Sequence, residues 1–139
     1  MQTENNLRHT RLKPPAIKLS ADDRERLERL AHASSALFPE TSDYLAHEVD
    51  RAQVVTSEER NFVCMGSEVQ FRDDSTGQVR RVTVVFPDQA DISAGRISVL
   101  TPIGAALIGL STGQSIEWRT PAGDERSLTV LWVKDAAAR

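Results

Sequence analysis

The residues with the greatest capacity for chemistry are few and widely spaced. The three histidines, His9, His32 and His47, form neither HExxH nor any other metal-binding spacing. His32 and His47 fall on the expected surfaces of two helices, where a histidine usually has an ordinary surface role. Cys64 is the single cysteine, so we expect no disulfide, and no nearby histidine activates it as a nucleophile. We therefore expect no enzymatic activity and no bound metal or cofactor.

Two pairs of residues have spacings that invite a chemical interpretation. Gly104 and Gly109 are separated as in a phosphate-binding loop, but no Lys-Ser or Lys-Thr follows them, so we infer no nucleotide site. Glu40 and Asp43 are three residues apart in the connection between two expected helices. Helix capping, the helix macrodipole and solvation account for both carboxylates without a ligand.

Composition limits the classes of protein to which the chain can belong. Its 139 residues suffice for one ordinary domain and a small appendage, and 40% are hydrophobic but only 5% aromatic. The low aromatic content argues against an aromatic-lined pocket. The net charge of −3 is uneven, because residues 20–60 carry ten acidic and five basic side chains, a net of −5. This acidic segment disfavours binding to nucleic acid, because such binding depends on clustered Lys and Arg side chains.

The beginning of the chain is expected to form a flexible tail over residues 1–17. This segment is polar and basic and contains Pro14 and Pro15. It has no apolar run long enough for a signal peptide, and nothing downstream approaches a membrane-spanning length. We therefore expect a cytoplasmic protein without membrane contact, and we expect it to be a monomer.

Residues 18–56 are expected to form a short antiparallel helical hairpin. Ser20 can cap the first helix, and Thr41 or Ser42 can cap the second. Each helix has a single apolar stripe and the connection is short, so the two helices should pack against each other. The stripes consist of Leu27, Leu30, Ala31, Ser34 and Leu37 in the first helix and Leu45, Val49 and Ala52 in the second.

Residues 57–135 are expected to form an antiparallel sheet curled over one short buried helix, which makes the fold class α+β. Thr101 can cap this helix, Pro102 suits its first position, and Gly113 is the expected stop signal. The helix is apolar on nearly every side and must be buried. Trp132 is expected to share one face of the last strand with Leu128 and Val130. The expected strands lie near residues 63–71, 79–86, 97–100, 115–120 and 126–133.

Several runs of sequence resemble known proteins. The run ISVLTPIGAALIGLSTGQSIEWRTPAG resembles the C-terminal domain of the Gre transcript-cleavage factors, the GreA/GreB family, and the upstream runs MGSEVQFRDDSTGQVRRVTVVFP and ADISAGRISV fit the same pattern in order. The segment LAHEVDRAQVVTSEE resembles the corresponding part of the regulators of nucleoside diphosphate kinase, the Rnk family. The resemblance implies an FKBP-like domain after a truncated Gre-type coiled coil.

The resemblance also implies a partner, RNA polymerase. Gre factors grip the polymerase with the turn before the buried helix, and the matching residues here are Leu100, Thr101, Pro102 and Ile103. Gre factors have an acidic residue at the position of Leu100, so apolar packing replaces a polar contact there. We expect a surface-exposed apolar turn, held rigid by Pro102, that docks on the largest-subunit rim of the secondary channel in competition with Gre factors.

Gre factors also carry acidic residues at the tip of a long hairpin, where they help to hold a metal ion and promote cleavage of backtracked RNA. Glu40 and Asp43 lie near the expected tip, but the Gre tip sequence Gly-Asp-Leu-Ser-Glu-Asn is absent and the arms are short. We therefore expect a regulator without cleavage activity or sequence-specific nucleic-acid binding, associated with nucleoside diphosphate kinase. Two alternatives remain open: a cleavage stimulator in which Glu40 and Asp43 share Mg²⁺, and a DNA-binding regulator.

Overall fold

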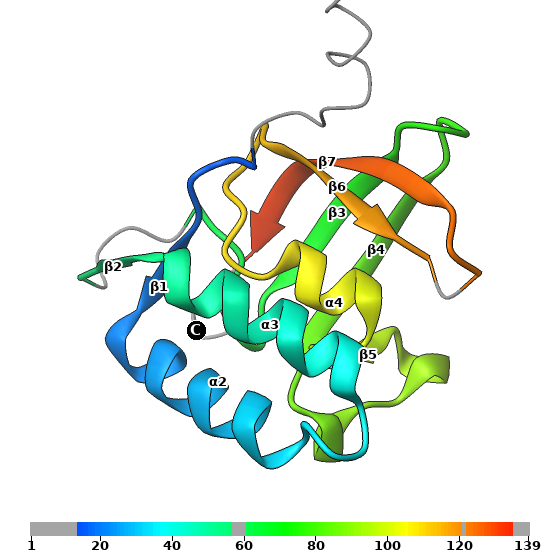
Figure 1. The fold of residues 1–139 in the computed structure, drawn as a ribbon. Helices are drawn as coiled ribbons and strands as arrows, with labels where there is room; N and C mark the ends of the chain where they lie inside the picture. Colours follow the sequence, from blue (N-terminus) through cyan, green and yellow to red (C-terminus); the bar gives the residue numbers. More distant parts are fainter. Residues whose placement is uncertain (1–13, 57–60, 121, 135–139) are drawn as a thin grey trace, which may run out of the picture.

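A helical hairpin packs against a curled five-stranded sheet in the described part of the chain (Figure 1). The structure is a computed structural model of the 139-residue chain, and it describes residues 14–56, 61–120 and 122–134. Most of the predicted tail, residues 1–13, and the first four residues of the predicted sheet domain, residues 57–60, lie outside this part. The hairpin consists of α2 (Ala21–Ala33) and α3 (Pro39–Arg51).

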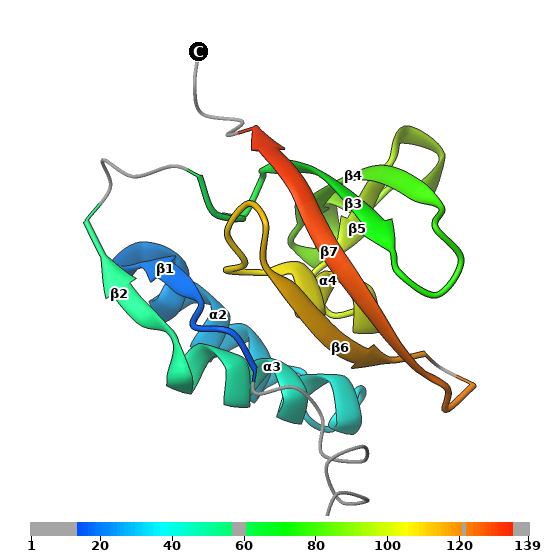
Figure 2. The ribbon, with the colours of Figure 1, turned by 90° about the horizontal axis from the view of Figure 1, so that it is seen from above.

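The sheet has the strand order β5-β4-β3-β7-β6. Neighbouring strands are antiparallel except at one edge, where β5 runs parallel to β4. The short helix α4 (Pro102–Leu107) follows β5 and lies between α3 and the curled sheet (Figure 2), which confirms the α+β fold class. The strands are β3 (Glu68–Asp73), β4 (Val79–Val85), β5 (Arg96–Ser98), β6 (Ser115–Arg119) and β7 (Glu125–Lys134), and two short 3-10 turns, η1 (Pro87–Gln89) and η2 (Ile92–Ala94), separate β4 from β5.

Helix α2 begins where the sequence predicts and ends earlier. The Oγ of Ser20 accepts a hydrogen bond from the Asp23 backbone N–H at 3.1 Å, which satisfies one of the unpaired donors of the first turn. Leu27 and Ala31 then point into the core. Because the helix ends at Ala33, Leu37 does not continue the apolar stripe, and its side chain is 78% exposed. The prediction for Leu37 was wrong.

Helix α3 begins at Pro39, and the predicted caps Thr41 and Ser42 lie inside it. Proline suits the first helical position because the amide hydrogen that it lacks would have no partner there. Ser42 is instead buried at the contact between the two helices. Its hydroxyl lies 2.8 Å from the hydroxyl of Ser34, which donates in turn to the carbonyl of Leu30.

Replacement of Ser42 by alanine is expected to lower the free energy of unfolding by about 1 kcal/mol, because the Ser34 oxygen then loses its buried donor. The double variant Ser34→Ala/Ser42→Ala should lose less than the sum of the two single losses, since neither hydroxyl is left without a partner across the interface. Urea unfolding of the three variants measures the coupling. Strictly additive losses would show that the two hydroxyls do not interact.

Two short strands that the sequence analysis missed tie the hairpin to the sheet domain. β1 (Lys18–Ser20) pairs in parallel with β2 (Gln53–Val55). The Lys18 N–H also donates to the carbonyl of Gly109 at 3.0 Å, so β1 lies between the end of the hairpin and the end of α4. Ile17, which was assigned to the end of the flexible tail, is 1% exposed.

Helix α4 is capped as predicted and stops sooner than predicted. The Oγ1 of Thr101 accepts a hydrogen bond from the Gly104 N–H, and Pro102 is the first helical residue. The helix ends at Leu107, and the stop is Gly109 rather than Gly113. Gly109 has a φ of +83°, and a Cβ there would lie 2.9 Å from the Cβ of Ile17. Glycine therefore permits both the turn and the close approach of β1.

Strand β7 contains an irregularity that changes which face Trp132 occupies. Gln70 of β3 pairs with Trp132, but the next residue, Phe71, pairs with Val130, so Leu131 is an extra residue in the ladder. Beyond such a bulge the side chains exchange faces. Trp132 consequently lies on the outer face, where the Arg81 guanidinium is 6.0 Å from its ring centre. The predicted common face with Leu128 and Val130 was wrong.

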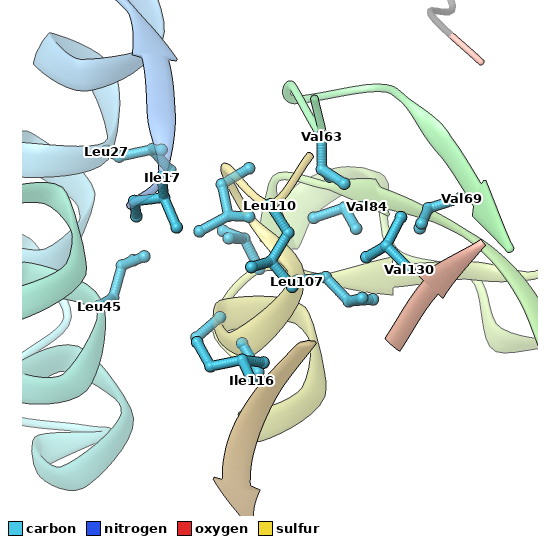
Figure 3. Packing of buried hydrophobic residues seen from close by; sticks show 14 of the residues in the cluster. Ile17, Leu27, Leu45, Val63, Val69, Val84, Leu107, Leu110, Ile116 and Val130 are labelled. Carbon is cyan, nitrogen blue, oxygen red and sulfur yellow. The ribbon is translucent and has the colours of Figure 1, made fainter. Parts of the chain in front are cut away.

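One continuous core joins the hairpin to the sheet (Figure 3). Leu27 and Leu45 reach it from the hairpin, Ile17 from the segment before β1, and Leu107 from α4. A polar contact adds to this packing, because the buried Asp23 carboxylate accepts a hydrogen bond from the Met65 N–H at 3.0 Å. The hairpin is thus packed into the domain, which fixes the position of α3 relative to the sheet.

Candidate functional site

The turn before α4 is rigid, and its hydrogen bonds explain why. The Ser98 carbonyl accepts from both the N–H and the hydroxyl of Thr101, at 3.1 and 2.7 Å. The Ser98 hydroxyl accepts from the Leu100 N–H at 2.9 Å. Gly104 packs so closely that a Cβ on it would overlap the Ser98 carbonyl oxygen. These contacts, with the fixed φ of Pro102, leave the turn little freedom.

The four predicted polymerase-contacting residues do not share one environment. Leu100 is 8% exposed and belongs to the hydrophobic core, whereas Thr101, Pro102 and Ile103 are half-buried. The expectation that Leu100 is exposed was wrong. Its physical cause is the tight turn on Ser98, which bends the chain after β5 so that two consecutive side chains, Val99 and Leu100, are both buried. The surface that this turn can offer therefore consists of Thr101, Pro102 and Ile103.

The two acids assigned to the hairpin tip lie within α3. The connection between the helices ends at Phe38, so Glu40 is the second residue of α3 and Asp43 the fifth. Both are exposed, and neither has a hydrogen bond or ion pair with any residue of the described chain. The tip itself carries apolar side chains, Leu37 and Phe38, which are 78% and 49% exposed.

A cleft of about 590 Å³ lies between α3, the start of α4 and the β6–β7 hairpin. Side chains of both α3 and β6 line the cleft, and α4 packs against both elements. Glu40 and Pro102 therefore meet at one site although they are far apart in the sequence. Sequence reasoning missed this cleft, because no local pattern indicates that side chains of α3 and β6 line a common cleft. The lining residues are Glu40, Thr41, Tyr44, Pro102, Glu117, Trp118, Arg119, Thr120, Ala122, Gly123 and Glu125.

Aromatic side chains gather in this cleft despite their rarity in the chain. The single tyrosine, Tyr44, and one of the two tryptophans, Trp118, both line it. The low aromatic content argued against an aromatic-lined pocket, whereas two of the residues that line this cleft are aromatic. Burial raises the pKa of the Tyr44 phenol far above its ordinary value, and the nearby Glu48 carboxylate adds to the effect. The phenol of Tyr44 therefore stays neutral well above physiological pH.

The charges around the cleft are predominantly negative. Glu40, Glu117 and Glu125 line it together with one basic side chain, Arg119, which forms an ion pair with Glu125 at 3.0 Å. Within residues 14–56, 61–120 and 122–134, no three His, Cys, Asp or Glu side chains gather in a way that could hold a metal ion. The same residues contain no helix with the length and apolar character needed to cross a membrane.

Comparisons with known families divide the chain where the hairpin joins the sheet domain. Residues 51–135 match the family described as "Transcription elongation factor, GreA/GreB, C-term", and residues 15–55 match the family described as "Rnk N-terminus". The chain belongs to the Rnk family. As a member of that family, it combines a GreA/GreB-type C-terminal domain with the Rnk type of N-terminal segment.

Individual relatives agree with this assignment. The chain is 40% identical over 119 residues to the "Regulator of nucleoside diphosphate kinase" of Escherichia coli K12, a match that covers 84% of this chain and 88% of that protein. A GreA/GreB transcription elongation factor structure from Nitrosomonas europaea has a TM-score of 0.67 and 39% identity, covering 86% of this chain and 98% of the other.

The likeness to GreA itself is partial. GreA of Syntrophobacter fumaroxidans is 41% identical over 70 residues, which is 50% of this chain and 44% of GreA. Residues 51–135 match the GreA/GreB C-terminal family, so the chain is a Gre-like regulator by family, and the activity of a whole GreA does not transfer with the match.

Proposed function

We propose that this Rnk-family protein binds RNA polymerase at the rim of the secondary channel, as a monomer in the cytoplasm, and competes there with Gre-type factors without stimulating RNA cleavage. Its effect on nucleoside diphosphate kinase, implied by the name of its relatives, is then regulatory. The protein and Gre-type factors then compete for one site on the polymerase, and their concentrations and affinities decide by mass action which of them is bound.

The rigid turn at Thr101, Pro102 and Ile103 carries this proposal. It belongs to the domain that matches the GreA/GreB family, and hydrogen bonds to Ser98 hold it in one conformation. A preorganised surface loses little conformational entropy when a partner binds. Leu100 supports the turn from the core and contributes little exposed surface.

The hairpin argues against the alternative of a cleavage stimulator. Each of its helices has 13 residues, which corresponds to roughly 20 Å at 1.5 Å per residue. The tip presents Leu37 and Phe38, while Glu40 lines the cleft on the side of α3. An assay of RNA cleavage in stalled polymerase complexes tests this alternative, and cleavage that depends on Glu40, Asp43 and Mg²⁺ would support it over the proposal.

Replacement of Pro102 by alanine is expected to weaken polymerase binding about tenfold, because the variant loses apolar contact and the rigidity of the turn. Its stability should change by less than about 1 kcal/mol, since alanine is a good residue at the first turn of a helix. Competition with labelled Gre factor for core RNA polymerase measures the affinity.

Pro87→Ala is the matched control for this measurement. Pro87 is likewise the first residue of a short helical turn, η1, is exposed, and does not line the cleft to which Pro102 contributes. It should leave the affinity unchanged. Absence of polymerase binding by the wild-type protein at micromolar concentration would contradict the proposed function, and equal losses in both variants would contradict the assignment to this turn.

A further inference from the structure

The helical hairpin forms one wall of the cleft to which Pro102 contributes. Glu40, Thr41 and Tyr44 line the cleft from α3, Pro102 lines it from the start of α4, and Trp118 from β6. The shared core keeps the hairpin in this position. A partner that touches Pro102 therefore has the α3 wall directly across the cleft.

The cleft has the composition of a protein-binding hot spot. Tyr44, Pro102 and Trp118 are each half-buried, so each presents apolar surface while the rest of its side chain is held by packing. Tyrosine and tryptophan are enriched among the residues that carry most of the binding energy at protein interfaces. A volume of about 590 Å³ accommodates several side chains of a partner.

The charge of the cleft indicates which side chains it accepts. Three carboxylates and one guanidinium line it, and the guanidinium of Arg119 is already paired with Glu125. Glu40 has no ion-pair partner in the described chain, so it is available to a cation from outside. A basic side chain that enters the cleft beside Glu40 also meets the aromatic lining of Tyr44 and Trp118, and aromatic rings attract cations. Acidic partners would be repelled.

We propose that this cleft binds a basic segment of RNA polymerase, and that α3 serves as the second wall of the docking site. The inference rests on the proposed function, and it extends the contact from the turn at Pro102 to the hairpin. The abbreviated hairpin then acts by completing the docking site, with Glu40 as the residue that selects for positive charge.

Two charge reversals on the same helix test this inference. Glu40→Lys places a positive charge in the cleft, whereas Asp43→Lys makes the same change in net charge three residues later, at an exposed position that does not line the cleft. Affinity for core RNA polymerase should fall at least tenfold for Glu40→Lys and less than twofold for Asp43→Lys. The difference should shrink as salt is raised, because salt screens exposed charges.

Two further measurements make the result specific. Glu40→Gln keeps the shape of the side chain and removes only its charge. The resulting loss of affinity for core RNA polymerase should be about half of that in Glu40→Lys on a logarithmic scale. Thermal unfolding should give similar midpoints for Glu40→Gln and Asp43→Lys, whereas Glu40→Lys should be slightly less stable, because Glu40 lies in the first turn of α3 and a lysine there opposes the helix macrodipole. If the stability of Glu40→Lys fell further, Glu40→Gln alone would still decide the outcome.

The possible outcomes separate this inference from the proposed function. If the wild type binds polymerase and Pro102→Ala weakens it, but Glu40→Lys behaves like Asp43→Lys, the docking site stops at the turn and the inference is wrong while the proposed function stands. If the wild type does not bind polymerase, both are wrong. A selective loss in Glu40→Lys supports both.

Discussion

Replacement of Leu100 by aspartate is expected to unfold a substantial fraction of the protein. Leu100 is 8% exposed and lies in the cluster that joins α4 to the sheet. Truncation of a buried leucine costs about 2–5 kcal/mol, and a carboxylate in apolar surroundings adds a desolvation penalty. We expect a loss of at least about 4 kcal/mol, a large share of the 5–15 kcal/mol that stabilises an ordinary domain.

Thermal and urea unfolding of the Leu100→Asp variant measure this loss directly. The thermal midpoint should fall by more than about 10 °C for a chain of this size. Leu100→Met is the control, because it conserves volume and apolar character and should cost less than about 1.5 kcal/mol. A midpoint equal to that of the wild type would show that Leu100 faces water, as the resemblance to Gre factors suggested.

This result matters for mapping the docking surface. Leu100→Asp would lose polymerase binding through loss of the fold, so its loss could not identify a contact. Pro102→Ala and Glu40→Lys alter side chains that line the cleft and leave the core intact. Their effects on affinity therefore report on the surface itself.

Local chemistry explains the features that could be predicted from the sequence. Ser20 and Thr101 cap α2 and α4 because a hydroxyl before a helix can reach an unpaired amide two or three residues later. Leu27, Leu45 and Val49 are buried as the helical periodicity indicates. The β6–β7 hairpin follows equally from two alternating segments joined by a turn that contains Gly123.

Features that depend on distant parts of the chain could not be predicted. β1 and β2 have three residues each, too few to show a periodicity, and they pair across the whole hairpin. The bulge at Leu131 turns Trp132 outward without any local signal such as glycine.

The cleft likewise depends on parts of the chain that are distant in sequence. Tyr44 and Trp118 are distant in sequence, and neither the rarity of aromatic residues nor the spacing of Glu40 and Asp43 indicates that α3 and β6 line a common cleft. The cleft forms because the hairpin packs on the sheet domain, and this packing involves Ile17, Leu27 and Leu45 together.

The packing of the hairpin includes one buried ion pair. Glu48 of α3 is 4% exposed, and its two carboxylate oxygens accept hydrogen bonds from Arg51 Nε at 3.0 Å and Nη2 at 2.8 Å. The remaining terminal nitrogen, Nη1, donates to the carbonyl of Pro15 at 2.6 Å. Arg51 thus neutralises a buried carboxylate and holds the backbone just before β1.

Replacement of Arg51 by alanine is expected to destabilise the protein by about 3 kcal/mol, because it leaves the Glu48 carboxylate buried without its cation. The value lies at the lower end for a buried pair, since the Arg51 side chain is 21% exposed. Urea unfolding provides the measurement.

The double variant Glu48→Met/Arg51→Met should recover most of the loss, because apolar side chains of similar volume remove the unpaired charge. Arg51→Lys should recover less, since an ammonium cannot reproduce the paired contact. If Arg51→Ala cost less than about 1 kcal/mol, the pair would not hold the hairpin, and the position of the α3 wall would have to rest on apolar packing alone.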